Sequence, residues 1–175
     1  MNTTVTRTTA LAALLLGGLS LAACAGSEAP AATPAGDDVW IEDAWIKAAD
    51  EGMSAGFGLL FNSGDADATV VSATTDAADR MELHETVESE TGEMLMREID
   101  GGFAIPAGSG LELAPGGSHL MLMDLTGPLE AGDEVSITLT FDDDSTYSFD
   151  APVKDYSGAN EEYGDGHDHS EMDHG

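Results

Sequence analysis

Side chains that could bind a soft metal ion gather in one part of this 175-residue sequence. Two histidines and three methionines lie between positions 84 and 121: His84, Met94, Met96, His119 and Met121. Thioether sulfur favours Cu(I), whereas zinc prefers thiolate, imidazole or carboxylate, and calcium and magnesium prefer oxygen. Because this stretch has no cysteine, the donor set predicts a site for monovalent copper.

The spacing of these residues places them on shared faces if they lie on β-strands. Side chains two residues apart in a strand point the same way and are about 7 Å apart. His119 and Met121 should therefore project together, while the leucines that alternate with them face a core. Met94 and Met96 share a face by the same rule, and a hairpin would bring His84 back beside them. The register of that hairpin is not fixed by the sequence, so either methionine could join the two histidines and Met121 on a surface patch.

Taken singly, these residues have ordinary explanations. Methionine often fills cores, and a single histidine on a strand is commonly just a polar surface residue. Met123 follows on the His119 face, and we assign it to packing. The metal interpretation depends on the residues occurring together.

The apolar residues along the rest of the chain alternate with a period of two, which is typical of strands. Turns rich in Gly, Pro and Asp separate the expected strands, and no helix of ten residues is expected beyond the N-terminal segment. One unbroken alternation in the first strand would place Trp40 and Ile46 on the same face. The pattern predicts an all-β, antiparallel sandwich or barrel, and three consecutive aspartates are expected to form a solvated turn rather than a calcium loop. The expected strands cover residues 40–47, 56–61, 69–73, 81–87, 94–99, 111–113, 119–125, 135–141 and 147–149.

The N-terminus is typical of a secretion signal. Arg7 precedes an apolar run over residues 10–23, which is too short for a confident membrane span. The run ends at Cys24, the only cysteine, in a segment that resembles the lipobox of bacterial lipoproteins. That resemblance implies cleavage before Cys24 and lipidation of its sulfur, and hence an extracytoplasmic protein anchored to the bacterial cell membrane.

Composition divides the chain into four parts. Residues 1–24 are the expected signal peptide with the lipobox cysteine, and residues 25–38 are an Ala/Pro/Gly-rich flexible linker. Residues 39–153 are long enough for one β-sandwich domain with its own core. Residues 154–175 form a polar, acidic tail that is expected to be disordered.

The net charge and the C-terminal tail lead to further predictions about partners and metal ions. The chain has 34 acidic and 5 basic residues, a formal net charge of −29, which excludes nucleic acid and anionic lipid surfaces as partners. In the tail, imidazoles are interleaved with carboxylates, a pattern suited to Cu(II) or zinc. A merely polar terminus is the alternative. The candidate secondary ligands there are His167, His169, Met172 and His174.

Several phrases of the domain resemble the PCuAC periplasmic copper chaperones. They are residues 81–85 (MELHE), 92–97, 101–108 (GGFAIPAG) and 113–125 (LAPGGSHLMLMDL). The resemblance implies a cupredoxin-like Greek-key sandwich that lacks the blue-copper cysteine. It also implies a Cu(I) site on the surface and delivery of copper to an acceptor protein, the CuA centre of cytochrome c oxidase. Carried over by position, the ligands would be His84, Met96, His119 and Met121.

The leading hypothesis is therefore a copper chaperone and not an enzyme. An electron-transfer cupredoxin is excluded because a blue-copper site needs a cysteine thiolate. A protein that sequesters copper or zinc in the cell envelope, without a dedicated recipient, would use the same ligands. A surface adhesion sandwich with a methionine core would bind no metal.

Overall fold

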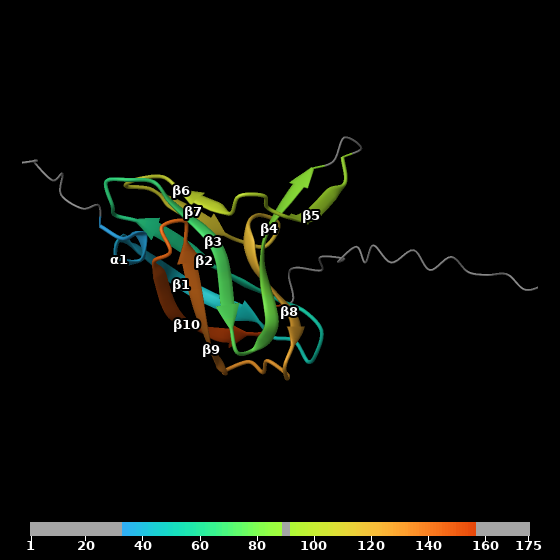
Figure 1. The fold of residues 1–175 in the computed structure, drawn as a ribbon. Coiled ribbons are helices and arrows are strands. Elements are labelled where there is room, and N and C mark those ends of the chain that lie inside the picture. Colours follow the sequence, from blue (N-terminus) through green and yellow to red (C-terminus); the bar gives the residue numbers. More distant parts are fainter. Residues whose placement is uncertain (1–32, 89–91, 157–175) are drawn as a thin grey trace, which may run out of the picture. The chain divides into compact units, whose positions relative to one another are not determined.

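The computed structural model describes residues 33–88 and 92–156, which form ten strands and one helical turn (Figure 1). Every predicted strand is present, and the only helix in this part of the chain has four residues. The elements are α1 (Ala35–Asp38), β1 (Val39–Lys47), β2 (Ser54–Asn62), β3 (Ala68–Thr75), β4 (Ala78–Glu88), β5 (Met94–Glu98), β6 (Phe103–Ile105), β7 (Gly110–Leu113), β8 (His119–Leu125), β9 (Glu134–Phe141) and β10 (Thr146–Lys154).

Hydrogen bonds connect the strands in the order β5-β4-β8-β2-β1-β10-β9-β3-β6, and β7 also pairs with β2. The strands form a sandwich in which β5, β4, β8, β2 and β1 make the first layer and β10, β9, β3 and β6 make the second (Figure 1). The all-β, cupredoxin-like sandwich is thus confirmed, with one difference: β1 and β10, which join the layers, run parallel. The core between the layers draws on both, as its largest fully buried side chains show: Ile46, Leu60, Leu120 and Leu122 from the first, and Phe103, Ile137, Leu139 and Phe141 from the second.

The first strand departs from the single alternation expected for it. Its pairing with β2 shifts register between Glu42 and Trp45, and Asp43 has a φ of 52°. The extra residue is a β-bulge, which reverses the alternation beyond it. Trp40 is exposed while Ile46 is buried in the core, so the prediction that they share a face is wrong. The bulge leaves Trp45 on the outer face of the first layer, against Phe57 of β2.

The helical turn α1 directly precedes Val39, the predicted start of the domain. The backbone N–H of Ala35 donates to Asp143 at 2.8 Å, and that of Gly36 donates to the hydroxyl of Ser145 at 2.8 Å. These bonds attach α1 to the turn between β9 and β10.

Several predictions fall outside the described residues. They concern the signal segment, Cys24, most of the linker, and the tail ligands His167, His169, Met172 and His174. Within residues 33–88 and 92–156, no helix has the length and apolar character needed to cross a membrane.

Candidate metal centre

The two histidines lie directly opposite each other on neighbouring strands. β4 and β8 are antiparallel, with His84 paired to His119 and Glu82 paired to Met121. Directly paired residues of an antiparallel sheet point to the same face. The imidazole centroids are 5.6 Å apart, and the ring planes meet at 68°. Long-range pairing therefore brings together two residues that are 35 positions apart in the sequence.

β8 is buried on both faces. Leu120 and Leu122 point into the core as predicted, while His119 and Met121 point to the outer face. That outer face was expected to be a surface patch, but His119 is 0% exposed and Met121 is 1% exposed. This half of the predicted site therefore lies beneath other side chains.

The cover over this half comes from the neighbouring strands β1 and β2. β2 pairs with β8 so that Ala55 lies opposite Met121. Phe57, two residues further on, has its ring centroid 6.2 Å from that of His119, and Trp45 of β1 packs on Phe57 at 4.6 Å. These aromatic rings and Met123 enclose Met121, which confirms the packing role assigned to Met123.

The turn before β8 fixes the orientation of the His119 ring. Gly116 has a φ of 80°, a left-handed conformation that favours glycine. The next residue, Gly117, presents its carbonyl oxygen 3.0 Å from Nδ1 of His119. A carbonyl can only accept, so Nδ1 carries the proton and the lone pair of a neutral ring is on Nε2. The Pro-Gly-Gly-x-His phrase thus has a structural role in positioning this imidazole.

His84 is held differently, by a carboxylate on its own strand. Its Nε2 lies 2.8 Å from Oε2 of Glu82, and its side chain is 13% exposed. The other ring nitrogen, Nδ1, is buried and has no hydrogen-bond partner among the described residues. Leaving a buried acceptor unsatisfied costs about 1–3 kcal/mol. A metal ion at Nδ1 would remove that penalty.

The β4–β5 hairpin distinguishes the two candidate methionines. Thr86 pairs with Met96, and Glu88 pairs with Met94. Met96 is therefore two residues along from the position opposite His84, about 7 Å, whereas Met94 is four residues along, about 13 Å. Met94 is 61% exposed while Met96 is partly buried. The register places Met96 nearer the histidine pair.

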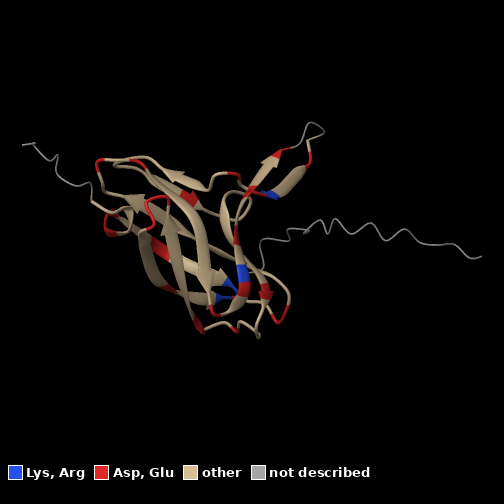
Figure 2. Ribbon diagram, viewed as in Figure 1, with Lys and Arg blue, Asp and Glu red and all other residues tan. Residues whose placement is uncertain are grey.

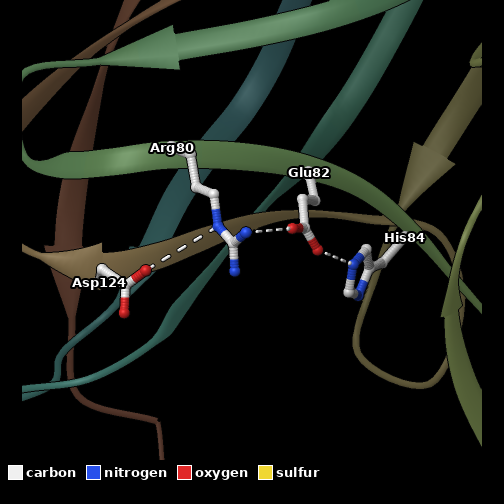
Figure 3. Close-up of polar contacts among 4 residues, drawn as sticks. All are labelled: Arg80, Glu82, His84 and Asp124. Atoms are coloured by element: carbon white, nitrogen blue, oxygen red, sulfur yellow. Dashed lines mark hydrogen bonds and ion pairs between the residues drawn. The ribbon is translucent and has the colours of Figure 1, made fainter.

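A line of charged side chains lies beside His84 on the outer face (Figure 3). Arg80 contacts Oε1 of Glu82 at 3.5 Å and Asp124 of β8 at 3.8 Å. On the opposite face of β4, Arg97 of β5 binds Glu85 at 2.7 Å. Along the ribbon, the positions of Lys and Arg are few and those of Asp and Glu are many (Figure 2).

His, Cys, Asp and Glu side chains alone do not form a metal site in this part of the chain. No group of three or more His, Cys, Asp or Glu side chains is arranged to hold a metal ion among residues 33–88 and 92–156. A site of three or four protein ligands in this region would therefore need donors of another type, and the thioethers of Met96 and Met121 are candidates.

Two contributors to this region were not identified from the sequence. Glu82 could have been found, because it is two residues before His84 and shares its face on any strand. The aromatic cover of Trp45 and Phe57 could not, because it depends on the bulge in β1 and on the pairing of β2 with β8.

Comparisons with known proteins agree with this architecture. Residues 39–153 match the model of the LpqE-like lipoprotein family. A protein of Leifsonia xyli subsp. xyli, "Putative lipoprotein Lxx21020", is 52% identical over 165 residues, which are 93% of this chain and 97% of that protein.

Solved structures of PCuAC domains share the fold. A copper-bound PCuAC domain from PmoF2 has a TM-score of 0.56 at 22% identity, covering 72% of this chain and 97% of that domain. An apo PCuAC domain from PmoF1 has a TM-score of 0.56 at 21% identity, covering 68% and 95%. The PCuAC resemblance inferred from sequence is thus confirmed at the level of the fold, and the chain belongs to the LpqE-like lipoprotein family.

Proposed function

We propose that this protein is an extracytoplasmic copper chaperone that binds Cu(I) through His84, Met96, His119 and Met121. The observation that carries the proposal is the direct pairing of His84 with His119 on one face, with thioethers on either side of the pair. Two imidazoles and two thioethers form a soft donor set that fits Cu(I) better than zinc or Mg²⁺.

The copper-bound PCuAC domain of PmoF2 supports this choice of metal, because it has the same fold. The buried Nδ1 of His84 supports it independently. A metal ion would satisfy that nitrogen, and no other group among the described residues does so.

The burial of the site suggests how copper would enter and leave. His119 and Met121 are enclosed, whereas Met96 lies on β5, which among the described residues is an edge strand paired with β4 alone. Copper would therefore be exchanged from the β5 side, with Met96 as the first ligand to detach. The acceptor would be a cuproprotein, and the CuA centre of cytochrome c oxidase is the candidate that the sequence resemblance implies.

An anchor and a tail would complete the proposed function. Lipidation of Cys24 would hold the domain at the membrane, which agrees with its membership of a lipoprotein family. Histidines 167, 169 and 174, together with Met172, would capture Cu(II) or zinc and raise its local concentration near the domain. Comparing Cu(II) uptake by the mature chain with uptake by a chain ending at Gly158 tests this role, and equal uptake would refute it.

Anaerobic Cu(I) titration against a competing chelator tests the proposed domain site. One Cu(I) should bind tightly to the chain ending at Gly158, and replacing both Met96 and Met121 by Leu should abolish that binding. Replacing Met123 by Leu is the matched control, since this methionine lies on the same strand face and is assigned to packing. Unchanged affinity in the double variant would refute the site.

Sequestration without a recipient is the second candidate function, and the burial of His119 and Met121 favours it over rapid exchange. A transfer assay separates the two. The Cu(I)-loaded chain is mixed with the apo CuA-bearing subunit of an oxidase, and the formation of CuA absorption is followed. Transfer faster than spontaneous copper release indicates a chaperone, whereas transfer limited by that release indicates sequestration.

A further inference from the structure

We propose that Glu82 is a positioning residue that holds Nε2–H of His84 and thereby presents Nδ1 of that ring to copper. This inference rests on the proposed function and extends it to a residue outside the ligand set. It also specifies which nitrogen of each histidine would bind the metal.

The first step is the tautomer of His84. Oε2 of the Glu82 carboxylate lies 2.8 Å from Nε2 of the ring. A carboxylate oxygen accepts hydrogen bonds and has no hydrogen to donate, so Nε2 must carry the proton. In the neutral ring the lone pair is then on Nδ1, which is buried and has no hydrogen-bond partner within residues 33–88 and 92–156.

The second step is the contrast between the two rings. His119 donates from Nδ1 to the carbonyl oxygen of Gly117 at 3.0 Å, so its lone pair is on Nε2. The two facing imidazoles are therefore held through different nitrogens by different acceptors, one a side chain and one the backbone. Copper binding at Nδ1 of His84 and Nε2 of His119 would therefore need no change of tautomer in either ring.

The third step is what holds Glu82 itself. Its other oxygen, Oε1, faces Arg80 at 3.5 Å, and Arg80 in turn lies 3.8 Å from Asp124 (Figure 3). Each oxygen of the Glu82 carboxylate thus has its own partner. The side chain of Glu82 is 22% exposed, whereas those of Arg80 and Asp124 are 57% and 69% exposed, so Glu82 is the most buried of the three charged groups.

Losing such a carboxylate should weaken copper binding without removing a ligand. Hydrogen-bond partners behind a metal-binding histidine fix its orientation, and mutating them typically costs about 10–100-fold in metal affinity. We expect a loss in this range for Glu82→Ala and a smaller loss for Glu82→Gln, whose amide oxygen can still accept from Nε2–H.

Nitrogen-15 NMR of the labelled chain ending at Gly158 tests the proposal, under mildly alkaline conditions in which imidazole is neutral. In the apo protein, Nε2 of His84 should carry a slowly exchanging proton, and Glu82→Ala should make that proton exchange rapidly. On adding Cu(I), which is diamagnetic, the ¹⁵N shift should change mainly at Nδ1 of His84 and at Nε2 of His119.

The matched control is Glu85→Ala. Glu85 is a carboxylate on the same strand, but it binds Arg97 on the opposite face. Its removal should leave both the Nε2 proton of His84 and the Cu(I) affinity unchanged within about twofold. A general loss of folding would appear in this control or in the backbone spectrum of Glu82→Ala.

Distinct results would overturn the role of Glu82 and the proposed function. A wild-type chain in which copper shifts Nε2 of His84, or an Ala variant with unchanged affinity and proton exchange, would refute the positioning role alone. If no ring nitrogen of either histidine responded to Cu(I), the proposed metal site would be refuted, and the positioning role with it.

Discussion

The two outer faces of this sandwich differ in the burial and the hydrogen bonding of their side chains. On the second layer, β9 and β10 pair polar residues with each other: Thr138 hydrogen-bonds Ser148 at 2.8 Å, and Ser136 donates to Asp150. On the outer face of the first layer, β8 instead carries His119 and Met121, both fully buried.

The outer face of the second layer is therefore a solvated surface, whereas the outer face of the first layer is covered at His119 and Met121. The hydroxyl ladder needs no ligand, because its members satisfy one another and water reaches them. On the outer face of the first layer, aromatic side chains cover Met121. The buried Nδ1 of His84 has no hydrogen-bond partner among the described residues. A sandwich needs only one core, and the proposed copper site would give the extra burial on this side a function.

Truncating a side chain on each face should give the largest difference in stability. Met121→Ala removes a fully buried side chain, and such changes typically cost about 2–5 kcal/mol because they leave a cavity. Thr138→Ala removes one hydroxyl from a largely exposed ladder and should cost about 1 kcal/mol or less.

Urea unfolding of the apo chain measures both free energies. Equal losses would mean that Met121 lies on an ordinary surface, and the contrast between the faces would collapse.

Conservative changes on the first face should separate packing from metal binding. Met121→Leu keeps the volume and should cost less than about 1.5 kcal/mol in stability, while lowering Cu(I) affinity at least about tenfold, or about 1.4 kcal/mol. Met96→Leu should have a similar effect on affinity.

Met94→Leu provides the comparison on the same hairpin, since Met94 lies further from His84 by the register. Its affinity for Cu(I), measured with a competing chelator, should stay close to that of the wild type. A loss in Met94→Leu and not in Met96→Leu would exchange the two ligands.

A smaller effect is expected in tryptophan fluorescence, in which Trp45 and Trp40 should respond differently to Cu(I). Trp45 packs in the cluster that encloses Met121, whereas Trp40 stacks on Phe61 at 5.4 Å, away from that cluster. Cu(I) should therefore change the emission of a Trp40→Phe variant, in which Trp45 is the reporter.

The Trp45→Phe variant should respond little to Cu(I). If both variants responded equally, the effect would be global and the site would not lie beneath Trp45.

The same contrast shows how far the sequence could be interpreted. The sequence predicted nine of the ten strands, mostly from period-two alternation, and missed β6. Alternation arises where one face of a strand lies in the core. It also placed Leu120 and Leu122 inward and His119 with Met121 outward. The alternation could not reveal what covers an outer face, since that depends on which strands become neighbours.

Two local features of the structure also could not be predicted from the alternation of apolar residues. The bulge at Asp43 reverses the alternation of β1 before Trp45. The residue types around it do not mark a bulge, so it could not be predicted from the sequence. The pairing register of β4 with β5, which favours Met96, could not be predicted either, because the alternation alone does not fix which residues are paired. The position of Glu82 beside His84, in contrast, follows from simple strand geometry.

The smallest expected effect belongs to the second layer, at the turn between β9 and β10. The hydroxyl of Ser145 donates to Asp143, and the backbone N–H groups of Ala35 and Ser145 also donate to it. These bonds, that of the hydroxyl first, lower the pKa of Asp143 below its usual value of 3.8. A carboxyl whose pKa is lower in the folded than in the unfolded state adds stability above the unfolded value, and this contribution is lost as pH falls through the folded value.

Asp143→Asn should therefore lower the free energy of unfolding slightly at neutral pH, and the difference from wild type should shrink as pH falls below about 4. Asp144→Asn removes a carboxylate from the same turn without touching these three hydrogen bonds, so it should leave this pH dependence in place. Urea unfolding at a series of acidic pH values measures both. A difference between wild type and Asp143→Asn that stayed constant with pH would mean that the bonds to Ala35 and Ser145 do not depend on the charge of Asp143. The attachment of α1 to this layer would then be a matter of hydrogen-bond geometry alone, like the hydroxyl ladder beside it.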